Sequence, residues 1–310
     1  MHVIIPAAVA LFCARPSSIL GALYLALNYG LFLQRFLLAL HFSEHRRLFQ
    51  PAYGVLNKVI PMLLAPLFGV PSGMYRLHHC IMHHAEDNLH PYDVSSTEPY
   101  NRGSFRQFLR YWLRFLVAIW LELPLYAFRR KRYARLAECL AVICGYSLVV
   151  RWLWCINSSA TIWALLVPHV VTSFALMIGN WSQHIFIDGR WPGSPYHFTY
   201  TCVNCPDNQR SFNDGYHVVH HLNSKLHWSE LPLRFIATID QHACENALVF
   251  ENIGFFDIGV AVFTRRFGFL VDNLRPLNTK TAQMSRSEAI SWLQSLLHPV
   301  SREMRDVKRH

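Results

Sequence analysis

The sequence predicts an all-α integral membrane protein, with about four transmembrane helices in two hairpins, interfacial helices, and a cytoplasmic helical cap that carries three histidine-rich motifs. Hydrophobic residues make up 52% of the 310 residues and charged residues only 15%, which is too apolar for an ordinary soluble domain of this size. Several apolar stretches approach the roughly 20 residues that a helix needs to span a bilayer. Short basic segments separate these stretches, as is typical of membrane proteins.

The N-terminal part of the chain predicts the first helical hairpin. Residues 1–40 are nearly all apolar and are interrupted chiefly at Arg15-Pro16-Ser17-Ser18, where we place the turn. The first helix of this hairpin is therefore short. Because no basic region precedes the apolar segment, we interpret the N-terminus as an uncleaved anchor and not as a signal peptide.

Residues 136–155 and 161–179 predict the second hairpin, since each segment is apolar over about the thickness of a membrane. The short polar turn Ile156-Asn157-Ser158-Ser159 joins them. Glu138 and Arg151 lie near the ends of the first segment, so their side chains must reach the interface.

Two further apolar segments are interpreted as interfacial or re-entrant. Residues 55–70 contain Pro61 and Pro66, which break a helix, so this segment is expected to dip into the bilayer without crossing it. Residues 108–128 are apolar enough to cross. A crossing there would carry the basic run at residues 129–132 to the far side, against the preference of basic loops for the cytoplasm.

The basic segments predict the orientation. Arg46-Arg47, residues 129–132 and the basic C-terminus are all expected to be cytoplasmic, together with the histidine motifs. Cytoplasmic loops that face anionic lipid also explain the net charge of +10. We expect no nucleic-acid binding, because no soluble domain with a basic face is visible.

Two regions are predicted along the chain. Residues 1–275 form the membrane domain, and residues 276–310 form a basic tail. Apolar residues recur within residues 286–310, which is typical of an amphipathic helix at a membrane surface. A partly disordered charged tail is the alternative.

Three histidine motifs are the strongest functional signal. Neutral imidazole is the commonest side-chain ligand of first-row transition metals. On a helix, residues three or four apart share a face, so the histidines within each motif can converge on one point. The motifs are His41-x-x-x-His45, His79-x-x-x-His83-His84 and His217-x-x-His220-His221.

The two doublets, His83-His84 and His220-His221, indicate two metals. Adjacent residues lie about 100° apart around a helix, so the members of a doublet most easily serve different metal ions. The sequence therefore predicts a dinuclear centre. Ligand type alone is compatible with zinc, copper, iron or nickel.

The order of these motifs resembles that of the integral-membrane fatty acid desaturase and hydroxylase superfamily. Gly215-Tyr216-His217-Val218-Val219-His220-His221 resembles the third histidine box of that family, and residues 180–184 resemble its NxxxH element. The second box departs from the common pattern, because three residues precede its doublet and His78 stands beside His79. The resemblance implies that His184 is a ninth ligand and that Asn180 contacts a metal through water.

The resemblance further implies two iron ions and dioxygen as co-substrate. The expected activity is that of an oxidoreductase that introduces a double bond into a lipid acyl chain, and a lipid hydroxylase of the same di-iron class is the alternative. The implied metal ligands are His41, His45, His79, His83, His84, His184, His217, His220 and His221.

We expect the electron donor to be a separate protein, because the sequence shows no haem-binding motif. A cytochrome b5 domain would bring an HPGG haem motif, whereas His90-Pro91-Tyr92-Asp93 lacks the glycines. We therefore expect a separate cytochrome b5 or ferredoxin to dock on the cytoplasmic face, where basic residues attract an acidic carrier. The expected location is the endoplasmic reticulum membrane if the source is eukaryotic. The nature of the lipid is left open.

Other candidate sites are weaker. Cys202-x-x-Cys205 lacks the second pair that a structural zinc site needs, so we interpret it as a packed or incidental thiol pair. His227 follows the third box closely and is a candidate supporting residue. His169 lies inside a predicted span and is expected to bond a backbone carbonyl that Pro168 leaves free, with a position facing the substrate channel as the alternative. A non-enzymatic membrane metal-binding protein is a further alternative.

Overall fold

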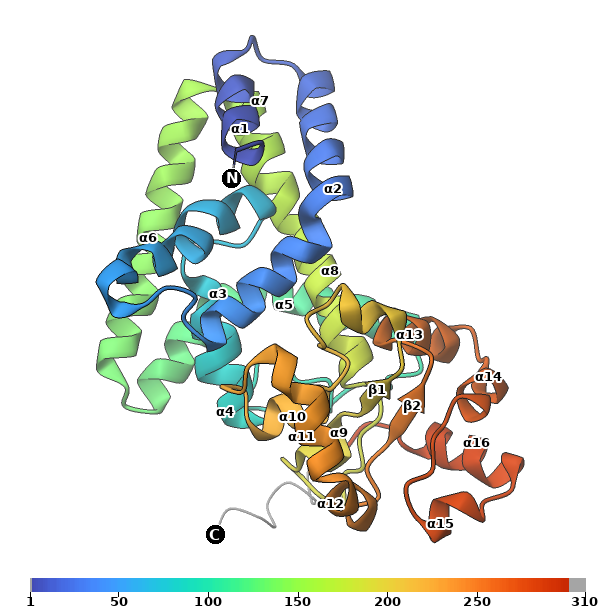
Figure 1. Ribbon diagram of the computed structural model, residues 1–310. Coiled ribbons are helices and arrows are strands. Elements are labelled where there is room, and N and C mark those ends of the chain that lie inside the picture. The colour runs from blue at the N-terminus through green and yellow to red at the C-terminus, as the bar shows by residue number, and fades with distance from the viewer. Residues whose placement is uncertain (1, 301–310) are drawn as a thin grey trace. The chain divides into compact units, whose positions relative to one another are not determined.

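The structure, a computed structural model, describes residues 2–300 and divides the chain into two compact units. The first unit comprises the chain up to Met82 together with Leu116–Leu176. The second comprises His83–Phe115 together with the chain from Met177 onward. Within the described residues the chain is mostly helical, as predicted, with one sheet of two short strands (Figure 1).

The N-terminal hairpin of the first unit consists of the short helix α1 (Ile4–Cys13) and the long helix α2 (Ser18–His45). Ser17 begins α2 by accepting a hydrogen bond from the backbone N–H of Leu20 at 3.3 Å, which satisfies one of the free donors at the helix start. The break between the helices therefore lies where the sequence places it.

The second hairpin pairs α6 (Tyr133–Ile156) with a continuous helical run of α7 (Ser158–Thr161), η5 (Ile162–Leu166) and α8 (Val167–Gln183). Asn157 occupies the turn and caps α7 through the N–H of Ala160 at 3.0 Å. Its amide also donates to the carbonyls of Phe12 and Ala14, at 3.3 and 3.1 Å. One side chain thus joins the turns of the two hairpins.

A broken segment follows α2, as its prolines predict. It consists of η1 (Pro51–Lys58), η2 (Val59–Leu64) and η3 (Ala65–Phe68), and it leads into α3 (Met74–His78) and η4 (His79–His83).

Close packing holds the broken segment against the hairpins. Phe68 stacks on Phe36 with ring centroids 3.9 Å apart. Gly69 has φ +76°, and a Cβ there would lie 2.1 Å from the carbonyl oxygen of Pro168, so glycine is required for both reasons. This packing fixes the end of α2, where the first histidine motif lies.

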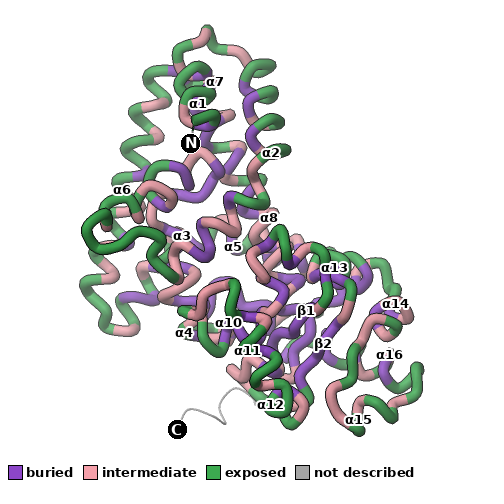
Figure 2. The backbone as a smooth tube through the Cα atoms, in the orientation of Figure 1, coloured by how far each residue is buried: buried purple, intermediate pink, exposed green. Residues whose placement is uncertain are grey.

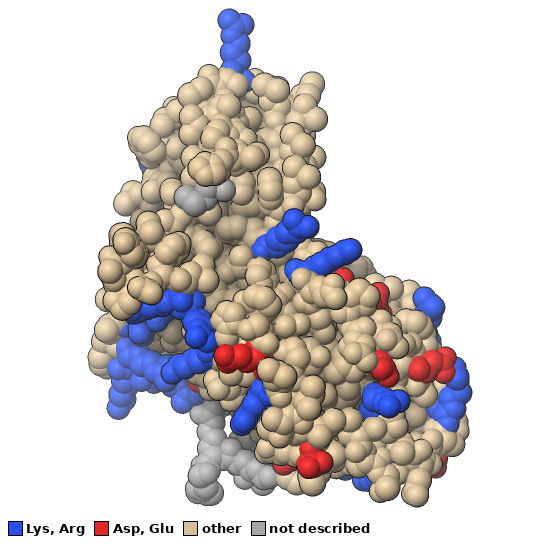
Figure 3. Space-filling view, viewed as in Figure 1, with Lys and Arg blue, Asp and Glu red and all other residues tan. Residues whose placement is uncertain are grey.

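Five segments of the described chain are long and apolar enough to cross a membrane: α2, η1 to η3, α5 (Phe105–Arg129), α6, and α7 to α8. The sequence prediction of about four spans omitted the broken segment and α5, and α5 is a continuous helix of 25 residues. Only 11% of the apolar window of α6 is buried, so its side chains are available to lipid (Figure 2). The face formed by α1, α2 and α6 carries few charges, as a lipid-facing surface requires (Figure 3).

The second unit is built from short helices and loops. Its sheet pairs β1 and β2 in parallel, with Cys202 opposite Phe250. Besides residues 105–115 of α5 and 177–183 of α8, its elements are α4 (His84–Glu86), α9 (Pro195–Phe198), β1 (Thr201–Val203), η6 (Pro206–Gln209), α10 (His217–Leu222), η7 (Trp228–Glu230), α11 (Leu231–Ala237), α12 (Ile239–Cys244), β2 (Val249–Glu251), α13 (Phe255–Phe263), α14 (Phe267–Asp272), α15 (Thr279–Ala282) and α16 (Arg286–Ser295).

Arg102 is fully buried and organises the loops of this unit. Its guanidinium donates to the carbonyls of Ile185, Leu296 and His298, at 3.0, 2.9 and 2.7 Å. Burial lowers the pKa of Arg102 to about 9, against the opposing effect of Glu98. The side chain thereby ties the chain that follows the second histidine motif to the chain that follows α8.

The predicted tail helix is present as α16. Its apolar residues Ala289 and Leu293 are 4% and 0% exposed, so they are packed inside the protein and are not presented to a membrane surface. The last ten residues of the predicted tail, 301–310, lie outside the described residues.

Candidate metal centre

The first unit brings together three predicted ligands. His41 and His45 lie one turn apart at the end of α2, and His79 begins η4. The ring centroid of His79 lies 4.5 Å from that of His41 and 5.0 Å from that of His45. One ligand nitrogen from each of the three rings lies within 4.8 Å of the others, which is close enough for one ion to be bound by all three.

The second unit contains a separate group of three. His83, His184 and His221 each offer a ligand nitrogen, and these nitrogens lie within 4.8 Å of one another. His83 and His184 are 1% and 0% exposed. The rings come from η4, from the residue after α8, and from α10, so folding of the whole unit is needed to assemble the group.

The third motif lies on α10, where His217 and His221 share a face and have ring centroids 4.8 Å apart. His220 points elsewhere, and its Nε2 lies 3.1 Å from Nε2 of His84. Each doublet is therefore divided. His83 and His221 belong to the group that contains His184, whereas His84 and His220 approach each other.

The protonation pattern fits a metal. Nδ1 of His184 lies 3.2 Å from the carbonyl oxygen of Phe198, which can only accept, so the proton is on Nδ1 and Nε2 carries a lone pair. Nε2 of His184, Nε2 of His217 and both ring nitrogens of His221 are buried and have no hydrogen-bond partner among residues 2–300. Buried polar atoms without a partner are rare and costly, and a metal ion would satisfy them.

The electrostatics of the second unit agree with this fit. Burial, followed by repulsion from neighbouring imidazoles, lowers the pKa of His184 and of His221 well below the ordinary 6.5. Both side chains are therefore neutral near pH 7, which is the form that binds a metal.

Asn180 lies on α8, one turn before His184. Its amide nitrogen donates to the carbonyl oxygen of Ser95 at 3.0 Å and to the hydroxyl of Tyr111 at 2.8 Å. Because the carbonyl of Ser95 can only accept, the orientation of the amide is fixed. Both amide hydrogens are then used, and the side-chain oxygen is the atom left to accept a further hydrogen bond.

Three carboxylates next to the histidines were not singled out from the sequence. Asp93 contacts His83 at 2.7 Å, whereas Asp214 lies 3.7 Å from His217 and Asp87 lies 3.7 Å from His221. Burial raises the pKa of Asp87 to about 6. The spacing of Asp214, three residues before His217, is the one local signal that pattern reasoning offers.

Two other histidines singled out from the sequence make contacts with the backbone. His227 accepts a hydrogen bond from the N–H of Ser229 and so caps η7, and its role beside the third motif stays a prediction. His169 bonds a backbone carbonyl as expected, but the carbonyl belongs to Gly69 at 2.9 Å and not to its own helix.

The CxxC pair lies at and just after β1 in the second unit. Cys202 and Cys205 are buried, and neither belongs to a metal-capable group among the described residues. Burial raises the pKa of both thiols, which disfavours the thiolate form that binds metals. The interpretation as a packed thiol pair therefore agrees with the structure.

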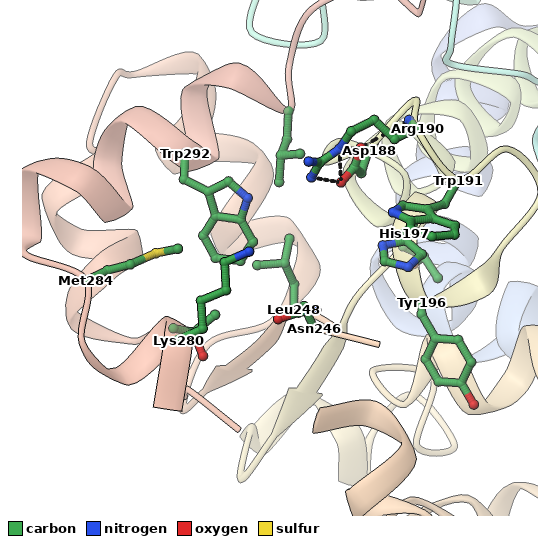
Figure 4. Close-up of a pocket in the computed structure, with 13 residues that line it drawn as sticks. Asp188, Arg190, Trp191, Tyr196, His197, Asn246, Leu248, Lys280, Met284 and Trp292 are labelled. Atoms are coloured by element: carbon green, nitrogen blue, oxygen red, sulfur yellow. Dashed lines mark hydrogen bonds and ion pairs between the residues drawn. The ribbon is translucent and has the colours of Figure 1, made fainter. Parts of the chain in front are cut away.

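A pocket of about 80 Å³ opens elsewhere in the second unit, between the loop after α8 and the helices α15 and α16 (Figure 4). Trp191, His197, Lys280 and Trp292 line it, and Arg190 is held at its edge by Asp188. The pocket contains none of the predicted metal ligands.

The comparisons with known proteins agree with the histidine geometry. The family model described as fatty acid desaturase matches residues 17–247, which include all three histidine motifs and the Asn180 to His184 element. No curated protein and no solved structure matched the chain. Because the family model covers most of the sequence, the chain belongs to the fatty acid desaturase family.

Proposed function

We propose that this protein is a membrane-bound, dioxygen-dependent di-iron desaturase that introduces a double bond into a lipid acyl chain. Family membership supports the class of lipid desaturases and hydroxylases. The observation that carries the proposal is the set of buried imidazole nitrogens on His184, His217 and His221 that have no hydrogen-bond partner in the described part of the chain. Such atoms are expected at a metal site and are unexpected in a packed protein core.

The proposal assigns two iron ions to the nine histidines. The divided doublets support two ions, since His83 and His221 group with His184, while His84 and His220 approach each other. The proposed ligands are His41, His45, His79, His83, His84, His184, His217, His220 and His221.

The side chains of the protein orient the proposed metal ligands and exclude water from them. Bound iron provides the activation of dioxygen for which no side chain is suited. The carbonyl of Phe198 orients His184, and burial excludes water from its ring. Asn180, whose amide hydrogens are committed to Ser95 and Tyr111, offers its oxygen to a water molecule. A weakly held water keeps a place that dioxygen can take.

The proposal includes a separate electron donor of the cytochrome b5 or ferredoxin type. Arg46, Arg47 and residues 129–132 belong to basic loops that would attract an acidic carrier on the cytoplasmic side. The substrate is a lipid or acyl chain, since the family acts in lipid metabolism and the chain contains membrane-spanning candidates. In a eukaryotic source the location would be the endoplasmic reticulum membrane.

A lipid hydroxylase of the same di-iron class is the alternative, because both reactions begin with removal of hydrogen from an unactivated C–H bond. Removal of a second hydrogen gives a double bond, and transfer of oxygen gives a hydroxyl. The site described above serves either outcome.

Lipid profiling tests the proposal. Cells that express the wild-type protein are compared with cells that express His184→Ala and with cells that express His298→Ala, whose side chain is exposed. We expect a new unsaturated lipid with the wild type and His298→Ala, and none with His184→Ala. An unchanged lipid profile with well-expressed, iron-loaded wild-type protein would favour a non-enzymatic metal-binding role.

A further inference from the structure

The closest charged neighbour of the second-unit histidines is Asp93. Its Oδ2 lies 2.7 Å from Nδ1 of His83, and the two side chains are 0% and 1% exposed. Asp93 follows His83 by ten residues and lies in the loop after α4. A buried carboxylate at this distance makes a short, charge-assisted hydrogen bond with an imidazole.

Ser95 fixes the other side of the carboxylate. Its backbone N–H and its hydroxyl both donate to Oδ1 of Asp93, at 2.8 and 2.7 Å. The oxygen of that hydroxyl also lies 3.3 Å from Nδ1 of His83. Because the hydroxyl hydrogen is used on Asp93, the Ser95 oxygen can only accept at this point.

Two acceptors therefore face Nδ1 of His83. An imidazole nitrogen between a carboxylate oxygen and an accepting hydroxyl must carry the proton. The lone pair of His83 is then on Nε2, the nitrogen that remains for a metal. A carboxylate behind a metal-binding imidazole also raises the basicity of the ring and so strengthens the metal bond.

This arrangement differs from that of the other histidines in the group. His184 is oriented by the neutral carbonyl of Phe198, and the Asp87 carboxylate lies 3.7 Å from His221, beyond hydrogen-bond length. Among the described residues, His83 is the member of this group that has a carboxylate oxygen within ordinary hydrogen-bond length. The effect of a carboxylate on metal affinity is therefore concentrated at His83.

We propose that Asp93 is a positioning residue that holds His83 as the Nδ1–H tautomer and thereby tightens the metal bound by His83, His184 and His221. The inference rests on the proposed function only in that this group holds a metal. It assigns a role to a residue that lies outside the three histidine motifs.

Asp93→Asn is the informative change, since it keeps the size of the side chain. If the amide oxygen accepts from the Ser95 N–H, the amide NH₂ faces Nδ1 of His83 and requires a lone pair there. The His83 proton then moves to Nε2, where it blocks the metal. The flipped amide would instead place two donors against each other at Ser95, so the first arrangement is favoured.

The effect of each substitution on metal affinity is measured by titrating chelator-treated protein with Co²⁺. The absorption of the bound ion reports how much Co²⁺ has bound. Asp93→Asn should weaken one Co²⁺ site by about 10–100-fold, the usual scale for residues that orient metal ligands. Ser95→Ala, which keeps the carboxylate, should weaken it by less than about threefold. Asp188→Asn is the matched control, because it removes an acid that pairs with Arg190 at the surface, and it should bind as the wild type does.

A second measurement is independent of whether Asp93→Asn folds. In metal-free wild-type protein with ¹⁵N-labelled histidine, NMR should show the proton of His83 on Nδ1, with the signal assigned by its loss in His83→Gln. Wild-type Co²⁺ affinity in Asp93→Asn, or a proton on Nε2 in the wild type, would overturn the inference. Failure of the wild type to bind any metal would instead overturn the proposed function, while the tautomer of His83 would still be measurable.

Discussion

The Nε2 atoms of His84 and His220 lie 3.1 Å apart, although the residues beside them, His83 and His221, belong to a different group with His184. Adjacent positions on a helix point about 100° apart, so each doublet sends its two rings in different directions. Two imidazole lone pairs at this distance repel each other unless a proton or a cation lies between them. Either a neutral N–H···N hydrogen bond or a bound cation would satisfy this contact, so it is compatible with a second metal ion.

The first prediction concerns metal content. Protein purified anaerobically with iron supplied should hold close to two iron ions per chain, because the doublets serve different ions. His221→Ala and His84→Ala should each lose about one ion, whereas His298→Ala should lose none. Elemental analysis by mass spectrometry measures this content. A wild-type content of one ion or none would refute the dinuclear assignment.

The second prediction separates the role of Asn180 from that of His184. Asn180→Ala should retain most of the iron but lose at least about tenfold in activity, because the proposal assigns its oxygen to a water molecule and not to the metal itself. His184→Ala should lose metal. Iron content and product formation are measured on the same preparations. Full activity in Asn180→Ala, or normal metal content in His184→Ala, would show that the NxxxH assignment is wrong.

The third prediction concerns α5 and the topology. Tags placed after Arg132 and after His310 should both be cytoplasmic, because the basic run favours that side and an even number of spans separates the two points from the first motif. Protease protection or a cysteine-labelling assay reports the side. A tag after Arg132 on the far side would show that α5, which is long and apolar enough to cross, is a true span.

The fourth prediction concerns Arg102. Arg102→Ala removes the guanidinium that donates hydrogen bonds to the carbonyls of Ile185, Leu296 and His298. These buried acceptors are then left unsatisfied. The free energy of unfolding should fall by about 3–5 kcal/mol, since each lost partner costs about 1–3 kcal/mol. Chemical denaturation in detergent measures the loss. Arg190→Ala, which removes an exposed arginine, is the control and should change stability by less than about 0.5 kcal/mol.

The fifth prediction concerns the stability of the metal-free protein as a function of pH. Burial lowers the pKa of His184 and His221 in the folded state, whereas the unfolded chain has the ordinary value of 6.5. As the pH falls below 6.5, the unfolded state takes up protons that the folded state does not. The stabilisation present above that pH is therefore lost, and the melting temperature should fall.

Asp87 acts in the opposite direction over part of this range. Its pKa is raised to about 6 in the folded state, so the folded protein takes up a proton as the pH falls through 6. Asp87→Asn removes this contribution and should make the loss of stability on acidification steeper. A melting temperature that rises as the pH is lowered from 7.5 to 5.5 in the wild type would contradict the assignment of buried neutral histidines.

Local patterns were sufficient to predict the hairpins and the histidine motifs. Helical spacing determines that His41 and His45 share a face, and a short polar turn stops α6 at Ile156, so neither depends on distant residues. Local patterns were not sufficient to decide whether α5 crosses the membrane. The charge argument predicted an interfacial segment, and the structure shows a continuous 25-residue helix whose crossing the sequence alone does not decide.

The partners of the histidines could not be predicted, because long-range packing selects them. Asp93 contacts His83 only after the loop beyond α4 folds back, and Tyr111 reaches Asn180 from a different helix, 69 residues away. No periodicity in the sequence marks either contact.

The most direct test of the proposed reaction is an incubation of iron-loaded protein with acyl lipid, a reduced cytochrome b5 or ferredoxin, and ¹⁸O₂, followed by mass spectrometry of the lipid. A desaturase should yield a lipid that has lost two hydrogens and gained no labelled oxygen, with consumption of dioxygen that disappears in His184→Ala. A lipid that carries ¹⁸O would contradict desaturation and assign the protein as the hydroxylase of the same class.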